Sequence, residues 1–229
     1  MTDARRAAGG ESAWQTFVQG AKELAKTLGP AILIALAVRS SVVQAFWVPS
    51  GSMLPTIQIG DHIFVNKLAY TVRMPIAEFP LTEPKPPERG DIVVFVGPHD
   101  PNTDLIKRVV AVAGDRIEIR KKKLFVNGVA AEDPYAHFEE PVALGQRDNM
   151  PEQTVPPGKF FVMGDNRDKS YDSRFWGFAD IASIKGRATF VYWSRDSQTC
   201  WDELRRSGVG RIFSPSCLPR WTRFGLHIN

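Results

Sequence analysis

The sequence predicts a mostly β protein, with an antiparallel, barrel-like β domain behind a single N-terminal transmembrane helix. Three observations support this class. One apolar stretch lies near the N-terminus, and beyond residue 52 the chain consists of short runs rich in Val, Ile and Phe, separated by Gly, Pro and Asp. The chain of 229 residues is 43% hydrophobic and 24% charged, which is enough for one substantial core.

The N-terminal apolar stretch covers residues 28–48, about 21 positions, which suffices to cross a hydrocarbon core of about 30 Å. Basic residues precede it, so we expect residues 1–27 in the cytoplasm and the remaining chain on the exported side. The acidic residues Glu11 and Glu23 ahead of the stretch argue against a cleavable secretory signal. Polar residues dilute its second half, so a surface-lying or buried helix is the alternative.

An exported β domain is predicted over residues 49–200, in which residues 116–160 contain a hairpin and a variable insertion. Residues 79–87 and 133–157 are predicted as loops, and Asn127-Gly128 is a strong turn signal. The predicted strands are Asp61 to Val65, Asp91 to Val96, Leu105 to Ala113, Arg116 to Arg120, Lys123 to Val126, Lys159 to Met163 and Ala188 to Trp193.

The charge balance argues against a nucleic-acid-binding protein, and the spacing of the two cysteines argues against a zinc site. The net charge is +4, and the compact basic run Arg120–Lys123 is too small for a nucleic-acid surface, so it is predicted as the solvated turn of a hairpin. Cys200 and Cys217 lack zinc-site spacing and form either a disulfide or two free thiols. The basic, aromatic tail at residues 201–229 either rests on anionic lipid or is solvated. No metal or organic cofactor is expected.

The first chemical feature is the turn PSGSMLPT at residues 49–56, directly after the apolar stretch. It holds Ser52 in a rigid, proline-bounded turn at a membrane face. Serine is a weak nucleophile near neutral pH and needs a base and an oxyanion donor. Taken alone, Ser52 is either an ordinary turn residue or a nucleophile.

The second feature is Lys107, within the predicted strand 105–113. Alternate residues of a strand share a face, and the companions of this lysine are all apolar: Leu105, Val109, Ala111 and Ala113. Burial among them lowers the pKa of an ammonium group, and a neutral lysine can act as a general base. The alternatives are an edge position with the ammonium in water, or a pair with Asp104.

The third feature is the polar segment 164–177, which follows a Phe-Phe-Val-Met strand. An elaborate polar turn is one interpretation, whereas a calcium loop fails on ligand spacing. The segment supplies hydroxyls and a carboxylate–guanidinium pair, either Asp165 or Asp172 with Arg174, that can hold a lysine amine in place.

Four motifs occur in a fixed order: PSGSMLPT at 49–56, GDIVVF at 90–95, IKRVV at 106–110 with Gly114-Asp115, and GDNRDxSxDSR at 164–174. In combination, from Arg39 to Trp193, they resemble the bacterial type I signal peptidases, also called leader peptidases. The resemblance implies a Ser/Lys dyad on a β fold exported from the bacterial inner membrane. It also implies cleavage of secretory preproteins at the translocon, after small residues in the Ala-x-Ala pattern.

Residue roles follow from the resemblance by motif match. Ser52 is the implied nucleophile, Lys107 the general base, and Ser50 with the Ser52 backbone N–H the oxyanion hole. Ser170 matches the family serine that hydrogen-bonds the lysine amine. Supporting positions are Asp165, Asp172 and Arg174, and the apolar Met53 and Leu54 match a site kept close to lipid. The expected partners are preproteins and membrane phospholipid, with no nucleic acid, and the protein is expected to be a monomer.

Other function classes match less of the sequence. A Ser-His-Asp hydrolase would need a Gly-x-Ser-x-Gly turn, and a β-lactamase-type site would need Ser-x-x-Lys. Self-cleaving repressor-type proteases also use Ser and Lys on β folds, but have no use for a membrane anchor. The alternative from a different class is a membrane-tethered β domain that binds exported peptides by strand addition without cutting them.

Overall fold

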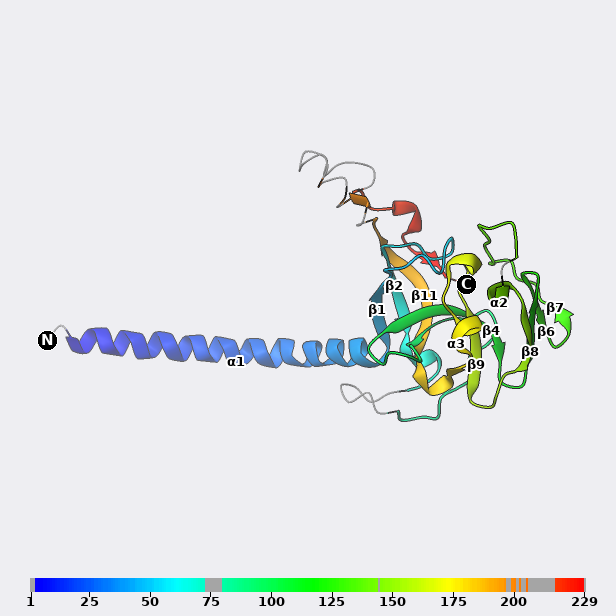
Figure 1. Cartoon of the computed structure of the whole chain (residues 1–229). Helices are drawn as coiled ribbons and strands as arrows, with labels where there is room; N and C mark the ends of the chain where they lie inside the picture. The colour runs from blue at the N-terminus through cyan, green and yellow to red at the C-terminus, as the bar shows by residue number, and fades with distance from the viewer. Residues whose placement is uncertain are drawn as a thin grey trace.

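A computed structural model describes residues 3–72, 80–143, 145–196, 199–200, 202, 205 and 217–228. A long N-terminal helix, α1, covers Asp3–Ser41 and extends from one side of a β-rich body (Figure 1). Within the described part of the chain, no helix combines the length and the apolar character needed to cross a bilayer.

The predicted apolar stretch, residues 28–48, is divided between a helix and a strand. The helix begins at Asp3, and after Ser41 the chain forms strand β1, Val43–Trp47, which pairs with β2. Valine and aromatic side chains favour a pleated surface, and here the neighbouring strand supplies backbone partners that a sequence window does not reveal.

Two antiparallel sheets make up the body. Among the described residues the larger sheet has eight strands: β1, β2 (Asp61–Asn66), β3 (Ile92–Val96), β4 (Asp104–Val112), β9 (Lys159–Met163), β10 (Ala179–Asp180), β11 (Ile184–Ser194) and β12 (Leu226–His227). The smaller sheet has four: β5 (Arg116–Arg120), β6 (Lys123–Val126), β7 (Val129–Ala130) and β8 (Met150–Thr154). Short helices connect them: α2 (Gly145–Asp148), α3 (Ser173–Trp176), η1 (Lys67–Ala69), η2 (Arg167–Lys169), η3 (Ile181–Ser183) and η5 (Trp221–Arg223).

The predominantly β, antiparallel class is confirmed. The larger sheet runs β1-β2-β11-β3-β4-β9-β10, with β12 beside β11, so β1 and β10 are its two ends and it is an open, curled sheet instead of a closed barrel (Figure 1). The seven predicted strands are all present, with shifted ends in some cases. Strand β8 was missed, because it lies in the segment 133–157 that was predicted as a loop.

Strand β4 is the central element of the fold because it is buried on both sides. Leu105 and Val109 pack in one hydrophobic cluster with Phe95 and Phe160, under the larger sheet. A second hydrophobic cluster, which includes Val110 of β4 and Ile117 of β5, joins the larger sheet to the smaller one. The predicted alternation fails at one point: the register shifts between Val109 and Ala111, so Ala111 packs with Val110 in the second cluster.

The basic run 120–123 forms the predicted hairpin turn, but it is not simply solvated. Lys121 and Lys122 have φ values of 49° and 69°, as a tight two-residue hairpin requires. The Lys122 side chain is only 11% exposed, and its Nζ lies 2.7 Å from the Asp168 carboxylate. This lysine therefore ties the smaller sheet to the polar segment 164–177.

The C-terminal tail is part of the body where it is described. Cys200 and Cys217 form a disulfide, and β12 pairs with β11. Ile228 is 3% exposed and lies in a core cluster. Residues 206–216 lie outside the described residues. Residues 217–228 are therefore held on the β domain with Trp221 and Phe224 exposed on its surface, and contact of this tail with anionic lipid stays a prediction.

Candidate active site

The Ser52 turn is a loop between the paired strands β1 and β2. Two backbone hydrogen bonds close its base, since Val48 N donates to the Asp61 carbonyl and Gly60 N donates to the Val48 carbonyl, both at 2.9 Å. Within the loop, Ile57 N donates to the Met53 carbonyl at 2.9 Å, which forms one helix-like turn. Ser52 itself is 8% exposed.

Lys107 of β4 meets this serine. Its Nζ donates to Ser52 Oγ at 2.6 Å, and the lysine is 4% exposed. Burial lowers the pKa of Lys107 from 10.5 to about 8; the nearby Asp172 carboxylate opposes this shift, and the Arg174 guanidinium adds to it. The alternative of a Lys107–Asp104 pair is wrong, because Asp104 pairs with Lys185 instead.

The polar segment 164–177 surrounds the contact between the serine and the lysine. Asn166 N donates to the Ser52 carbonyl at 3.1 Å. A Cβ atom added at Gly164 would lie 2.4 Å from the Ser52 carbonyl oxygen and 2.3 Å from Ser170 Oγ. Glycine at position 164 therefore lets the turn and the segment approach each other closely.

Ser170 lies in this group, but its hydroxyl does not make the expected bond. Its Oγ is buried and has no hydrogen-bond partner, so the expected contact with the Lys107 amine is absent. The Lys107 Nζ instead donates to Ser52. A buried hydroxyl without a partner is costly, and rotation about one side-chain bond is the simplest way for it to gain one.

The two aspartates of the segment have separate partners, which resolves the alternative left open by the sequence. Arg174 binds Asp172 with two hydrogen bonds, Nε to Oδ1 at 2.8 Å and Nη2 to Oδ2 at 2.9 Å. Asp172 Oδ2 also accepts from Gly164 N at 3.0 Å. Both side chains are at most 1% exposed. The pair fixes the backbone that faces Lys107.

Asp165 pairs with Arg108, the residue after the lysine. Arg108 Nε and Nη2 donate to the two Asp165 oxygens, each at 2.8 Å, and both side chains are at most 3% exposed. Thr56 Oγ1 donates to the same carboxylate at 2.6 Å. Asp165 thus joins the Ser52 turn to the strand that carries Lys107.

Arg108, Thr56 and a second buried arginine, Arg167, were not identified from the sequence. Arg167 is 1% exposed and forms an ion pair with Asp133, from the segment predicted as a loop. One signal was available for Arg108. It follows Lys107 directly in an apolar strand, and a buried arginine requires an acidic partner elsewhere.

The remaining predicted residues lie at different depths. Ser50 is exposed, two residues before the serine. Met53 is fully buried in a core cluster with Ile57, so its side chain anchors the turn from below, and its expected closeness to the membrane stays a prediction. Leu54 is half-buried.

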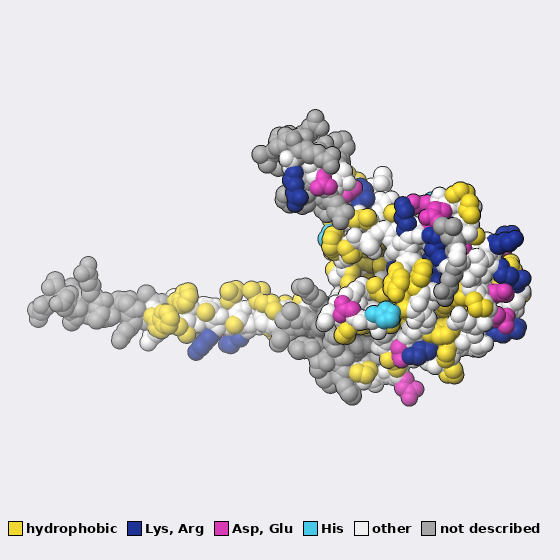
Figure 2. Space-filling model, viewed as in Figure 1, with side chains coloured by type: hydrophobic (Ala, Val, Ile, Leu, Met, Phe, Trp, Pro, Cys, Tyr) yellow, Lys and Arg dark blue, Asp and Glu magenta, His cyan; other side chains and the backbone are white. Residues whose placement is uncertain are grey.

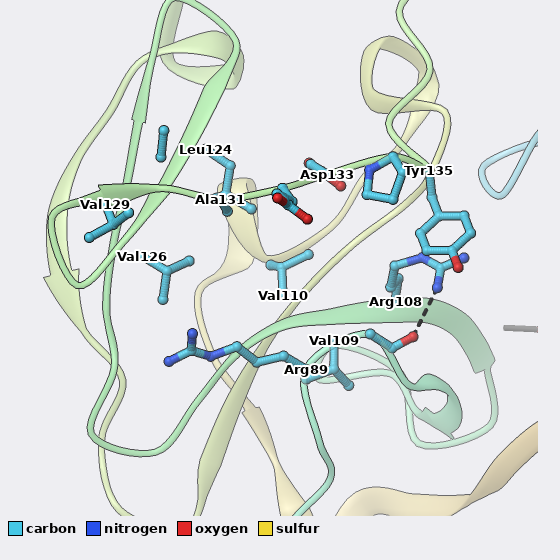
Figure 3. Close-up of a pocket in the computed structure, with 14 residues that line it drawn as sticks. Arg89, Arg108, Val109, Val110, Leu124, Val126, Val129, Ala131, Asp133 and Tyr135 are labelled. Atoms are coloured by element: carbon cyan, nitrogen blue, oxygen red, sulfur yellow. Dashed lines mark hydrogen bonds between the residues drawn. The ribbon is translucent and has the colours of Figure 1, made fainter.

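A groove between the two sheets lies beside this site and does not include the serine or the lysine (Figure 3). Its walls are mostly aliphatic. At one end Tyr135 lies over the Arg108 guanidinium, 3.7 Å from the ring centre. The Arg108 Nη1 donates to the Gly90 carbonyl at 2.9 Å, drawn as the dashed line. The groove thus adjoins the support of the site and not its reacting groups.

Comparison with known proteins identifies the family. The family described as signal peptidase, peptidase S26, matches residues 21–193. The chain belongs to this family. Signal peptidase I of Pseudomonas aeruginosa is 35% identical over 89% of this chain and 78% of its own length. That of Pseudomonas fluorescens is 34% identical over the same shares.

Two further proteins are similar to this chain. Thylakoidal processing peptidase 1 of Arabidopsis thaliana is 34% identical over 88% of this chain and 58% of its own length. A signal peptidase I structure from Enterococcus faecalis is 32% identical, with a TM-score of 0.38 over 45% of this chain and 97% of its own. As a signal peptidase I family member, the chain is a serine endopeptidase that removes signal peptides.

Proposed function

We propose that this signal peptidase works through a Ser/Lys dyad in which Ser52 is the nucleophile and Lys107 the general base. The observation that carries the proposal is the 2.6 Å contact between Lys107 Nζ and Ser52 Oγ at a lysine that is 4% exposed. A pKa near 8 leaves a useful fraction of the amine neutral under mildly alkaline conditions.

The first step is acylation. In the reactive state the amine is neutral and accepts the Ser52 hydroxyl proton as Oγ bonds to the scissile carbonyl carbon. The C–N bond then breaks, and Lys107 returns the proton to the leaving amine. An ester of Ser52 remains. A water gives a proton to the same amine as its oxygen bonds to the ester carbonyl carbon. The bond between that carbon and Ser52 Oγ then breaks, Lys107 returns the proton to Oγ, and the acid product leaves with its new C-terminus.

The oxyanion of both tetrahedral intermediates needs donors on the exposed side of the turn. We assign this role to the Ser52 backbone N–H and the Ser50 hydroxyl. Ser50 is exposed two residues before the nucleophile, which suits a donor that meets substrate. Removal of one such donor from a hydrolase costs about 100- to 1000-fold in kcat.

The substrates we propose are secretory preproteins cut after small residues, in the Ala-x-Ala pattern of signal peptides. Support comes from the family match and from the relatives named signal peptidase I.

The test is cleavage of a synthetic signal-peptide substrate by the full chain in detergent. Ser52→Ala and Lys107→Ala should each reduce turnover to background. Lys107→Arg should not restore it, since a guanidinium stays protonated and cannot act as a base. Lys185→Ala is the matched control, because Lys185 lies in β11 and pairs on the surface with Asp104. Robust cleavage by Lys107→Arg would refute the dyad, and a peptide bound but uncut by the wild type would favour a binding domain.

We further propose that helix α1 anchors the enzyme in the bacterial inner membrane in a single pass, with the N-terminus in the cytoplasm and the body on the outer face. Its exposed apolar side chains support contact with phospholipid, and Figure 2 shows such side chains along much of the helix: Trp14, Phe17, Leu24, Leu28, Ile32 and Ile34. Exposed Trp47, Trp221 and Phe224 add apolar surface on the body.

The topology test is protease treatment of spheroplasts. The proposed arrangement predicts that the body is digested from outside while an N-terminal tag survives. Digestion of both ends, or of neither, would contradict it. Carbonate extraction separates a spanning helix from one that only lies on the surface, because a surface helix is released.

A further inference from the structure

The C-terminal segment 217–228 lies beyond the part of the chain that matches the family, which ends at residue 193. It returns to the body next to β11 and β2 (Figure 1, red). The Cys200–Cys217 disulfide joins its start to the chain that follows β11. Gly225 N donates to the Val191 carbonyl, and Ile228 N donates to the Thr189 carbonyl, both at 2.8 Å. The segment is therefore fixed in place.

Two arginines of this segment bind residues 56–61, which follow Ser52 in the chain. Arg223 Nη2 donates to the Thr56 carbonyl at 2.9 Å and lies 2.6 Å from Asp61 Oδ2. Arg220 Nη1 donates to the Gln58 side-chain oxygen at 2.8 Å. The Asp61 carboxylate is fully buried and the Arg223 side chain is 11% exposed, so water screens this ion pair weakly.

Thr56 connects Arg223 to the elements that carry Ser52 and Lys107. Its carbonyl accepts from Arg223, while its hydroxyl donates to Asp165, which binds Arg108 beside Lys107. Thr56 is thus held from two sides by groups that come from distant parts of the chain. A shift at Thr56 would separate the serine turn from the lysine strand.

The path from Thr56 to Ser52 is short and stiff. One helix-like turn spans it, closed by the bond from Ile57 N to the Met53 carbonyl. Met53, Ile57 and the tail residue Ile228 belong to one buried cluster below the turn. The tail therefore supports the turn both by packing and by charge.

We infer that Arg223 is a positioning residue for catalysis: by binding Asp61 and the Thr56 carbonyl at once, it keeps Ser52 Oγ within reach of Lys107. The C-terminal segment thereby becomes part of the active-site support of this enzyme. The inference rests on the proposed Ser/Lys mechanism. It assigns Arg223 no contact with substrate.

Two substitutions separate positioning from plain stability. Arg223→Lys keeps a cation near Asp61 but lacks the planar fork needed to reach both partners. Arg223→Gln removes the charge. Arg116→Gln is the matched control, because Arg116 forms a surface pair with Glu152 in which both side chains are at least 43% exposed.

The experiment measures kcat and KM for a synthetic signal-peptide substrate with the full chain in detergent, at a temperature where circular dichroism shows each variant folded. We expect Arg223→Lys to keep a melting temperature close to wild type and to lose kcat about tenfold, with KM unchanged. Arg223→Gln should lose about 100-fold per folded molecule, as a displacement of about 1 Å can cost. Arg116→Gln should match the wild type.

Wild-type kcat per folded molecule in Arg223→Lys would overturn the inference, and this variant decides the question if Arg223→Gln fails to fold. Ser52→Ala, run in parallel, separates the two proposals. If it retains activity, the Ser/Lys mechanism fails and the positioning role fails with it. If it is inactive while both Arg223 variants behave as wild type, only the positioning role fails.

Discussion

Lys107 should make the folded protein less stable at neutral pH than a methionine in its place would. At pH 7 the lysine is largely protonated in both states, and the folded state bears the cost of burying the charge. The drop in the Lys107 pKa from 10.5 to about 8 corresponds to about 3 kcal/mol. Lys107→Met removes this charge. The substitution should therefore raise the free energy of unfolding by most of this amount, less about 1 kcal/mol for the lost hydrogen bond to Ser52.

The sign of the pH dependence follows from proton binding. Between pH 8 and 10.5 the unfolded chain holds more protons at this site than the folded one, so the unfolding free energy of the wild type rises with pH relative to the variant. The stability gain of Lys107→Met should therefore shrink by about 2 to 3 kcal/mol between pH 7 and pH 10.

Urea unfolding followed by tryptophan fluorescence measures this difference at both pH values, with Lys185→Met as the surface control. Other titrating groups cancel because they are common to both proteins. A variant that is no more stable than wild type at pH 7, with a difference that does not depend on pH, would refute the reasoning. The same pKa should appear in catalysis: kcat/KM should rise with pH through a midpoint near 8 and then level off.

Three further predictions concern the support of the site. Arg174→Met should destabilise the protein by about 3 to 5 kcal/mol in urea unfolding, because it strands a fully buried aspartate, and a loss below about 1 kcal/mol would contradict this. Replacement of Cys200 and Cys217 by serine should cost about 3 kcal/mol in the same assay, and an unchanged midpoint would show that the disulfide contributes nothing. Gly164→Ala should abolish peptide cleavage while the chain still folds, since its methyl group would meet the Ser52 carbonyl, and normal turnover would exclude that clash.

The sequence was sufficient to predict the strands and turns that depend on residues close together in the chain. Short apolar runs between turn residues located seven strands, and Asn127-Gly128 has the positive φ values that its turn type needs. The burial of Lys107 also followed from the apolar alternation along β4. Its contact with Ser52 was implied by the family motifs, because the two residues lie 55 positions apart.

The tertiary structure decided which charges meet. No pattern in the chain pairs Asp165 with Arg108, or Arg223 with Asp61, because side-chain partners across a sheet depend on strand order and register. Strand β1 and the tail were assigned to membrane or solvent for the same reason: each is stabilised by a neighbour far away in the chain. Residue type and spacing thus determined the chemistry available to this protein, whereas long-range pairing determined where that chemistry is held.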